Sequence, residues 1–267
     1  MAQHSSAEGP RPLIIDFHTH PGFTSSLEAA RAQFAPMLEE AQRHHVTWLC
    51  VSALADLAQS PTPAQLRESN DAVLILMEEH PDAVLGFCYA NPAYPEESVR
   101  EIDRCIDAGM AGVKLHVAVQ ANAPRVDPIA ARAAELGVPI LQHAWYKVDG
   151  HRPTESVPAQ VAELAARHPK TMLVMAHLTG GGERGLADIA PYPNLHVDTS
   201  GSEPEAGVTE MAVRKLGAKR VVFGTDSSGR GFAAALGKVL GAKVTAKQKE
   251  MILGLNAARL MRRRLGR

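Results

Sequence analysis

The sequence predicts a single domain with a (β/α)8 barrel fold, and three observations lead to this prediction. Short apolar runs rich in β-branched residues alternate with longer segments of helical periodicity along the whole chain. Eight such runs can be found, and several are apolar throughout, as in parallel strands that are buried on both faces. The chain has 267 residues, which is close to the roughly 250 of a typical barrel. No Gly-x-Gly-x-x-Gly motif follows a strand, so a closed barrel fits better than an open dinucleotide-binding sheet.

The eight expected strands are separated by intervals long enough to hold a helix. Each is a short run dominated by aliphatic residues. In chain order they cover residues 13–18, 46–52, 84–90, 112–117, 139–144, 172–177, 195–200 and 220–226.

The expected helices lie between these strands and carry apolar residues at helical spacing. Proline and glycine mark many of the joins, as in Leu136-Gly137-Val138-Pro139. The clearest helices cover residues 27–45, 64–80, 96–108, 127–136, 157–168 and 209–216.

The two ends of the chain complete one domain over residues 1–267. Residues 1–12 are polar, contain prolines and lack the apolar run of a signal peptide, so a flexible N-terminal segment is expected there. Residues 246–267 are expected to form a final helix. The basic run Arg262-Arg263-Arg264 near its end is typical of a solvated helix terminus, because cations there complement the helix dipole.

The overall composition bears on the partners and the compartment of the protein. The formal net charge is -1, from 28 basic and 29 acidic residues, so there is no electrostatic reason to expect nucleic acid or an anionic membrane as a partner. No apolar run approaches the roughly 18 residues of a membrane span. Cys50, Cys88 and Cys105 are odd in number and widely spaced, which predicts free thiols in a reducing compartment. We therefore expect a cytoplasmic protein, and the sequence leaves a homodimer open.

Ionisable residues cluster at the ends of the expected strands. Barrel active sites are built from the carboxyl ends of the strands, so these side chains are expected to meet at one mouth. They are Asp16, His18 and His20 on the first strand, Lys114 and His116 on the fourth, His143 on the fifth, His177 on the sixth and Asp226 on the eighth.

A metal ion is the simplest common explanation for this cluster. His18 and His20 are two residues apart and so project from the same face of a strand, roughly 7 Å apart along it. Taken singly, each group has an ordinary alternative: Lys114 could pair with a carboxylate, and Asp226 could cap the helix that follows. Many charged groups in one cavity, however, are costly unless they are paired or bound to metal. A site of imidazole and carboxylate ligands suits Zn²⁺, Mn²⁺ or Fe²⁺ better than Mg²⁺, and Zn²⁺ is the first expectation.

Six motifs in the chain resemble those of the amidohydrolase superfamily, in its amidohydrolase-related branch. The resemblance covers nearly the whole chain, in the family's order and on the expected strands, and residues 256–260 resemble that branch's C-terminal helix. The motifs are Asp16-Phe17-His18-Thr19-His20, Gly112-Val113-Lys114-Leu115-His116, Pro139-Ile140-Leu141-Gln142-His143, Ala176-His177-Leu178-Thr179-Gly180-Gly181, Val197-Asp198-Thr199-Ser200 and Phe223-Gly224-Thr225-Asp226.

The resemblance implies a barrel with one or two divalent metals. Members similar to aminocarboxymuconate-semialdehyde decarboxylase hold one metal, and for this chain the implied ligands are His18, His20, His143 and Asp226, with His177 as the acid/base. Binuclear members instead carry a carboxylated lysine that bridges two metals. In that scheme Lys114 would be the bridge, and His143 and His177 would hold the second ion.

The function predicted from these residues is metal-dependent hydrolysis of a C–N or C–O bond in a small, carboxylated molecule. In this scheme Asp226 takes the proton of a metal-bound water, and His177 stabilises the developing oxyanion or moves the proton. The alternative is a lyase, a non-oxidative decarboxylase or hydratase on the same metal scaffold. A barrel that binds metal or ligand without catalysis is a third interpretation, which the complete ligand set disfavours.

The substrate-binding residues expected from the sequence are His116, Trp145 and Arg184. His116 shares the parity of Lys114 on the fourth strand. The loop over residues 145–152 combines aromatic side chains with cations and suits a flat or carboxylated molecule. Arg184 follows the Gly180-Gly181-Gly182 turn and could hold an anionic group.

Overall fold

Eight parallel strands form a barrel in the order β1-β2-β3-β4-β5-β6-β7-β8. The computed structural model describes residues 12–55, 60–202 and 205–262; the expected N-terminal segment, apart from Pro12, lies outside them, as does the end of the basic run. The strands are β1 (Ile15–Thr19), β2 (Trp48–Val51), β3 (Val84–Ala90), β4 (Gly112–Leu115), β5 (Ile140–Gln142), β6 (Leu173–Met175), β7 (Leu195–Asp198) and β8 (Val221–Val222).

Backbone hydrogen bonds join the last strand region to the first and nearly close the barrel. Phe17 N donates to Phe223 O at 2.9 Å, and Asp226 N donates to His18 O at 2.8 Å. Beyond them a single parallel bridge pairs Thr19 with Ser227. The predicted fold class is confirmed.

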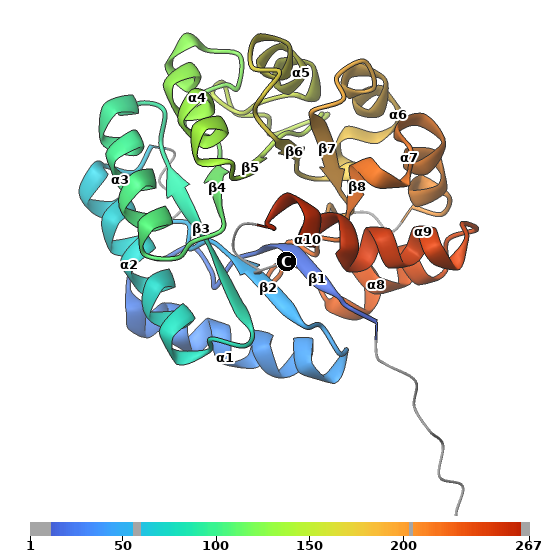
Figure 1. Ribbon diagram of the computed structural model, residues 1–267, viewed down its shortest axis with the longest axis horizontal. Helices are drawn as coiled ribbons and strands as arrows, with labels where there is room; N and C mark the ends of the chain where they lie inside the picture. The colour runs from blue at the N-terminus through green and yellow to red at the C-terminus, as the bar shows by residue number, and fades with distance from the viewer. Residues whose placement is uncertain (1–11, 56–59, 203–204, 263–267) are drawn as a thin grey trace, which may run out of the picture.

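Helices surround the strands on the outside (Figure 1). Several begin where the sequence provides a cap: Ser26 accepts a hydrogen bond from Ala29 N, and Thr62 forms a capping box with Gln65. They are α1 (Leu27–Arg43), α2 (Pro63–Glu79), α3 (Pro95–Asp107), α4 (Asp127–Leu136), α5 (Pro158–Arg167), α6 (Leu178–Ile189), α7 (Val208–Leu216) and α8 (Phe232–Leu240), with short 3-10 turns at Pro124–Val126 and Ala218–Arg220.

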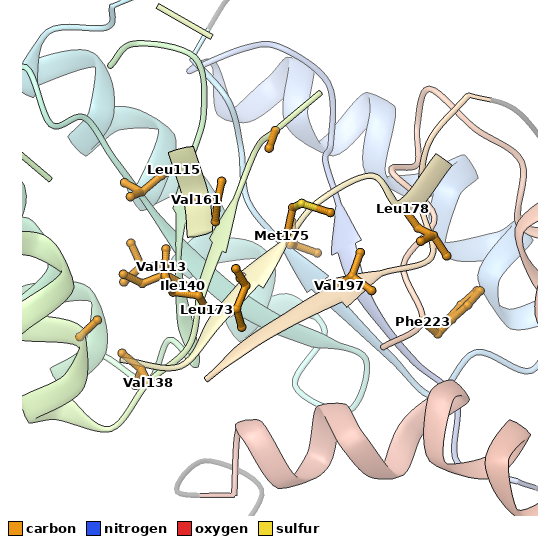
Figure 2. Packing of buried hydrophobic residues seen from close by; sticks show 14 of the residues in the cluster. Val113, Leu115, Val138, Ile140, Val161, Leu173, Met175, Leu178, Val197 and Phe223 are labelled. Carbon is orange, nitrogen blue, oxygen red and sulfur yellow. The ribbon is translucent and has the colours of Figure 1, made fainter. Parts of the chain in front are cut away.

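The largest group of buried side chains lies between the strands and the helices. Figure 2 shows part of it, where aliphatic residues of β4 to β7 such as Val113, Ile140 and Val197 point toward the helix layer. Burial of this surface is the main source of stability for the barrel, at about 25 cal/mol for each Å² of apolar area.

A second buried group fills the inside of the barrel at its amino-terminal end. It combines Ile15, Phe17 and Phe87 from the strands with Leu260 and Met261 from the end of the chain. The rings of Phe17 and Phe87 meet edge to face with centroids 5.0 Å apart. The C-terminal residues thus act as a plug, and Figure 1 shows their helix across this end of the barrel.

The C-terminal plug is formed by α9 (Ala246–Glu250), a π-helical turn at Met251–Leu255 and α10 (Asn256–Leu260). Asn256 Nδ2 donates to Ala218 O and Val221 O, both at 2.7 Å, which fixes α10 to the start of β8. The expected single C-terminal helix is therefore interrupted by a π turn.

The structure differs from the sequence prediction mainly at the strand ends. Strands such as β6 and β8 stop before the polar residues that the prediction included in them, because the backbone there turns out of the ladder. Helices α6 and α8 were not singled out by periodicity; both contain glycine, which lowers helix propensity. The three cysteines are buried and free. Among the described residues, no helix combines the length and apolar character that crossing a membrane requires.

Candidate metal centre

A cavity of about 320 Å³ opens at the carboxyl-terminal end of the barrel. The residues that line it lie on, or directly after, seven of the eight strands. Its lining consists of His18, His20, Phe23, Leu54, Lys114, His116, His143, Trp145, Lys147, His177, Ser202, Asp226 and Arg230. Most of the residues predicted to form the site are therefore brought together.

His18, His20 and Asp226 form a compact group of possible ligands at the base of this cavity. The Nε2 atoms of His18 and His20 are 3.0 Å apart. Asp226 Oδ1 lies 3.5 Å from His18 Nε2 and 3.7 Å from His20 Nε2. Their three donor atoms lie within 4.8 Å of one another, so together they could hold one metal ion.

The other nitrogen of each imidazole is fixed by an acceptor. His20 Nδ1 donates to Ser52 O at 2.7 Å, and His18 Nδ1 donates to Asp198 Oδ2 at 2.7 Å. These bonds place the ring proton on Nδ1, so both Nε2 atoms carry no proton and face each other as acceptors, and only His18 Nε2 has a donor nearby, Lys114 Nζ at 2.9 Å. Two lone pairs at 3.0 Å repel unless a cation binds them. The donor set therefore fits a divalent metal ion.

His143 and His177 form a second pair with the same arrangement. His143 Nδ1 and His177 Nε2 are 3.1 Å apart. His143 Nε2 donates to Glu155 Oε1 at 2.7 Å, and His177 Nδ1 donates to Ser200 Oγ at 3.0 Å, whose own hydroxyl donates to Asp198. Again the facing nitrogens are left without protons. The predicted ligands thus divide into a group of three and a pair.

Lys114 lies beside the first of these two groups. Its side chain is fully buried, and Nζ donates to His18 Nε2 at 2.9 Å. Burial lowers the pKa of Lys114 to about 8, although Asp226 and Asp198 oppose the shift. An amine that loses its proton near neutral pH can react with CO2, which is what a carboxylated lysine requires.

Burial also keeps the imidazoles of the site neutral, which is the form that binds metals. It lowers the pKa of His20 to about 3 and moves the pKa values of His18 and His177 well below the usual range. Burial raises the pKa of Asp226 to about 6, with Lys114 acting in the opposite direction.

Two residues of the site adopt left-handed backbone conformations that are unusual without glycine. The φ angles are 72° at His177 and 63° at Asp226, a conformation that costs about 1–3 kcal/mol. His177 N is held by Asp198 Oδ1 at 2.9 Å, and Asp226 N by His18 O at 2.8 Å. The site itself thus stabilises the conformation that turns these side chains toward the cavity.

Several functional contacts involve residues that the sequence analysis did not assign. Asp198 appeared only within a motif, yet its carboxylate connects His18, His177 and Ser200. Its position at the end of β7 was the available signal. Glu155 is fully buried between His143 and Lys147, and no local pattern marks it. Hydrogen bonds from these two residues outweigh its burial and lower the pKa of Glu155 to about 2.

Asp16 lies deeper and acts on the backbone. It accepts hydrogen bonds from His18 N and Thr225 N, both at 3.0 Å, and from Thr225 Oγ1 at 2.6 Å. It therefore connects the first and last strand regions below the metal ligands.

The expected substrate-binding residues separate into two kinds. His116 and Trp145 line the cavity, with ring centroids 5.0 Å from His143 and 4.8 Å from His177 respectively. Arg184 is exposed on α6, and its guanidinium stacks over the ring of Tyr146 at 4.1 Å. Arg184 is not part of the cavity lining.

Several solved structures share the fold of this chain at low sequence identity. The chain is 18% identical to a dihydroxybenzoic acid decarboxylase from Polaromonas sp. JS666 with bound manganese and 2-nitroresorcinol, with a TM-score of 0.79 over 96% of this chain and 98% of that one. For 2,6-dihydroxybenzoate decarboxylase complexed with 2,6-dihydroxybenzoate the identity is 19%, the TM-score 0.76 and the coverage 95% and 99%. For 4-oxalomesaconate hydratase from Rhodopseudomonas palustris these values are 14%, 0.72, 94% and 96%.

The sequence comparison identifies the family more directly than the shared fold does. Curated protein sequences give no significant match. The family model described as amidohydrolase (Amidohydro_2) matches residues 15–263, which is nearly the whole chain and includes every residue of the site. The chain belongs to the amidohydrolase family.

Proposed function

We propose that the protein is a metal-dependent lyase that removes CO2 from a small aromatic or conjugated carboxylic acid without oxidation. The observation that carries this proposal is the cavity of about 320 Å³, which combines inward-facing bare imidazole nitrogens with the aromatic walls Phe23 and Trp145. That volume suits a ligand near the lower end of the usual size range. The likeness to decarboxylases and to a hydratase supports a lyase over the hydrolase expected from the sequence.

The proposed metal ligands are His18, His20 and Asp226, with His143 Nδ1 as the next available donor. Imidazole and carboxylate fit Zn²⁺ and Mn²⁺, and we favour Mn²⁺ because a structurally similar decarboxylase has manganese bound. A bound divalent metal would supply a Lewis acid that polarises a substrate oxygen. Whether one or two ions bind depends on Lys114, whose carboxylation would favour two.

The chain's own residues would orient the substrate and provide a proton. In the reaction the bond between the ring carbon and the carboxylate breaks, and its electron pair stays on the ring carbon. That carbon then takes up one proton as CO2 leaves. We assign His177 as the residue that moves this proton, because its ring packs against Trp145 at the cavity wall. Its Nε2 carries no proton in the free protein, so it would take one up before it delivers it to the ring carbon.

Hydrolysis is the second candidate, because the same donor set can activate water.

The test of the proposed lyase uses full-length protein purified without chelator, with its metal content measured per chain. The metal-loaded protein is incubated with 2,6-dihydroxybenzoate and related aromatic acids, and CO2 release is measured. Release that stops in His177→Asn while the metal content stays unchanged is the expected result.

Each other outcome has a defined meaning. Ring opening or hydrolysis of lactones and amides, without CO2 release from any acid, would replace the lyase with the hydrolase. Metal content near zero that cannot be restored by Mn²⁺ or Zn²⁺ would exclude both.

A further inference from the structure

Arg230 carries a positive charge at the cavity wall, and neighbouring groups accept hydrogen bonds from only part of its guanidinium. It follows β8 and lines the same cavity as the imidazoles. Nη2 donates to Ser202 Oγ at 2.7 Å, and Nη1 donates to Gly229 O at 2.8 Å. A guanidinium has five N–H donors, so three remain. One of them, Nε, is buried and has no acceptor among the residues that the structure describes.

The partners of Arg230 are neutral oxygens, in contrast to those of the neighbouring cation at the mouth. Lys147 also lines the cavity, but its Nζ lies 2.7 Å from Glu155 Oε1, which neutralises it. Within the described ranges, no carboxylate lies within ion-pair distance of Arg230. A buried donor without an acceptor destabilises the protein, and a bound anion would remove this cost.

A second cation strengthens the positive potential on this side of the cavity. Lys238 of α8 donates to Thr199 O at 2.8 Å. It shares with Arg230 a small crevice of about 60 Å³, which the hydroxyl-bearing Ser202 and Thr225 also line. Burial lowers the pKa of Lys238 and Arg230 lowers it further, whereas the carboxylates of Asp198 and Asp226 oppose the shift. Two cations in contact with one crevice, both bonded to neutral oxygens, favour an anionic group nearby.

We propose that Arg230 is a substrate-binding residue that holds an anionic oxygen group, a carboxylate or a phenolate, of a planar substrate. This inference rests on the proposed function, since it takes the cavity to be the substrate site. A guanidinium fork matches such oxygens in geometry as well as in charge. The aromatic walls Phe23 and Trp145 would then hold the ring, and the imidazole group would face another of its oxygens. Arg230 takes the role that the sequence analysis expected of Arg184.

The test is binding to metal-loaded, full-length protein by calorimetry with three probes of the same ring. They are 2,6-dihydroxybenzoate, 2-nitroresorcinol, whose phenol is made acidic by the nitro group, and neutral resorcinol. Arg230→Ala is expected to weaken binding of 2,6-dihydroxybenzoate about 10- to 100-fold and that of resorcinol less than about threefold. Weaker binding of 2,6-dihydroxybenzoate alone indicates that Arg230 holds a carboxylate, whereas weaker binding of both anions indicates that it holds an anionic oxygen that the two probes share.

Arg184→Ala is the matched control, because it removes an arginine outside the cavity and should leave all three affinities unchanged. Metal content and the melting temperature of Arg230→Ala should match those of the parent protein. Equal weakening of anionic and neutral probes, unchanged binding of the anions, or no binding of either anion to the parent protein would overturn the inference. If the anions bind through Arg230 but no CO2 is released, the inference stands and only the proposed reaction fails.

Discussion

At its amino-terminal end the barrel is closed by side chains of α10, whereas at its carboxyl-terminal end it opens on imidazoles and carboxylates. At the closed end, aromatic and aliphatic residues fill the interior, and Asn256 satisfies two backbone carbonyls. At the open end, four imidazoles present unprotonated nitrogens to one another in two close pairs.

The contrast shows how one fold divides stability from function. The closed end buries apolar surface and satisfies its hydrogen bonds, and both effects favour the folded state. At the open end, lone pairs of neighbouring imidazoles repel each other, and His177 and Asp226 have left-handed backbone conformations. Both features disfavour the folded state. A bound cation and substrate would remove much of that cost, so the open end is built for ligands. Four predictions test this division.

The largest expected effect is loss of the metal at the open end. His18→Ala combined with His20→Ala removes two of the three grouped donors, so metal content should fall to near zero and any turnover by at least about 1,000-fold. Mass spectrometry of the intact protein measures the metal content, and near-ultraviolet circular dichroism checks that the variant is folded. A folded variant that retains its metal would refute the assignment of these ligands.

Truncation at the closed end should have the opposite profile. Leu260 is 5% exposed and packs inside the barrel, so Leu260→Ala should lower the free energy of unfolding by about 2–5 kcal/mol. Metal content per folded chain should stay unchanged. Leu255→Ala, at a position 49% exposed on the same C-terminal segment, serves as the control and should change stability by less than about 0.5 kcal/mol. Similar urea midpoints for the two variants would contradict the claim that the C-terminal plug stabilises the barrel.

The closed end also holds a titratable group, which makes its stability depend on pH. Burial lowers the pKa of His196 to about 4 from 6.5. Because the unfolded chain takes up this proton first, stability is lost as pH falls from about 6.5 to 4, by at most about 3 kcal/mol. Urea unfolding of the parent protein and of His196→Gln should therefore show a stability difference that changes over this range. A difference that is constant with pH would argue against a neutral buried imidazole.

The smallest of the four effects is expected at Glu155, behind the open end. Glu155→Gln weakens the hydrogen bond that orients His143 and leaves Lys147 without its counter-charge, so metal affinity or activity should fall about 10- to 100-fold. A chelator competition titration measures the affinity. Glu163→Gln is the control, since that carboxylate bonds only Asn122 at the surface among the described residues. Equal affinities for the two variants would show that Glu155 does not position His143.

Much of the fold was predictable because its signals are local. Each strand region was recognised from a short aliphatic run, and strand order follows chain order in this barrel. The missed helices α6 and α8 carry glycines that weaken a local helical signal. The strand ends were placed too late, because His177 and Asp226 turn out of the ladder in a backbone conformation that composition does not reveal.

The sequence by itself determined which residues stand at the carboxyl ends of the strands, and therefore the identity of the imidazoles, Lys114 and Asp226 at the mouth. Only the tertiary structure decided how they pair and which nitrogen of each ring faces the cavity. Alternation along the strand predicts that His18 and His20 face the same side, and both line the cavity, but it does not predict how each ring is turned. Their ring orientations come from partners far along the chain, such as Asp198, which lies 180 residues from His18.

Contacts between distant parts of the chain also explain why Arg230 lines the cavity and Arg184 does not. Both arginines follow a strand and a glycine-containing turn, so their local sequences are alike. Arg184 stacks on Tyr146 outside the cavity lining, whereas a hydrogen bond to Ser202 holds Arg230 at the cavity. Such contacts join loops from different strands, and no local pattern encodes them.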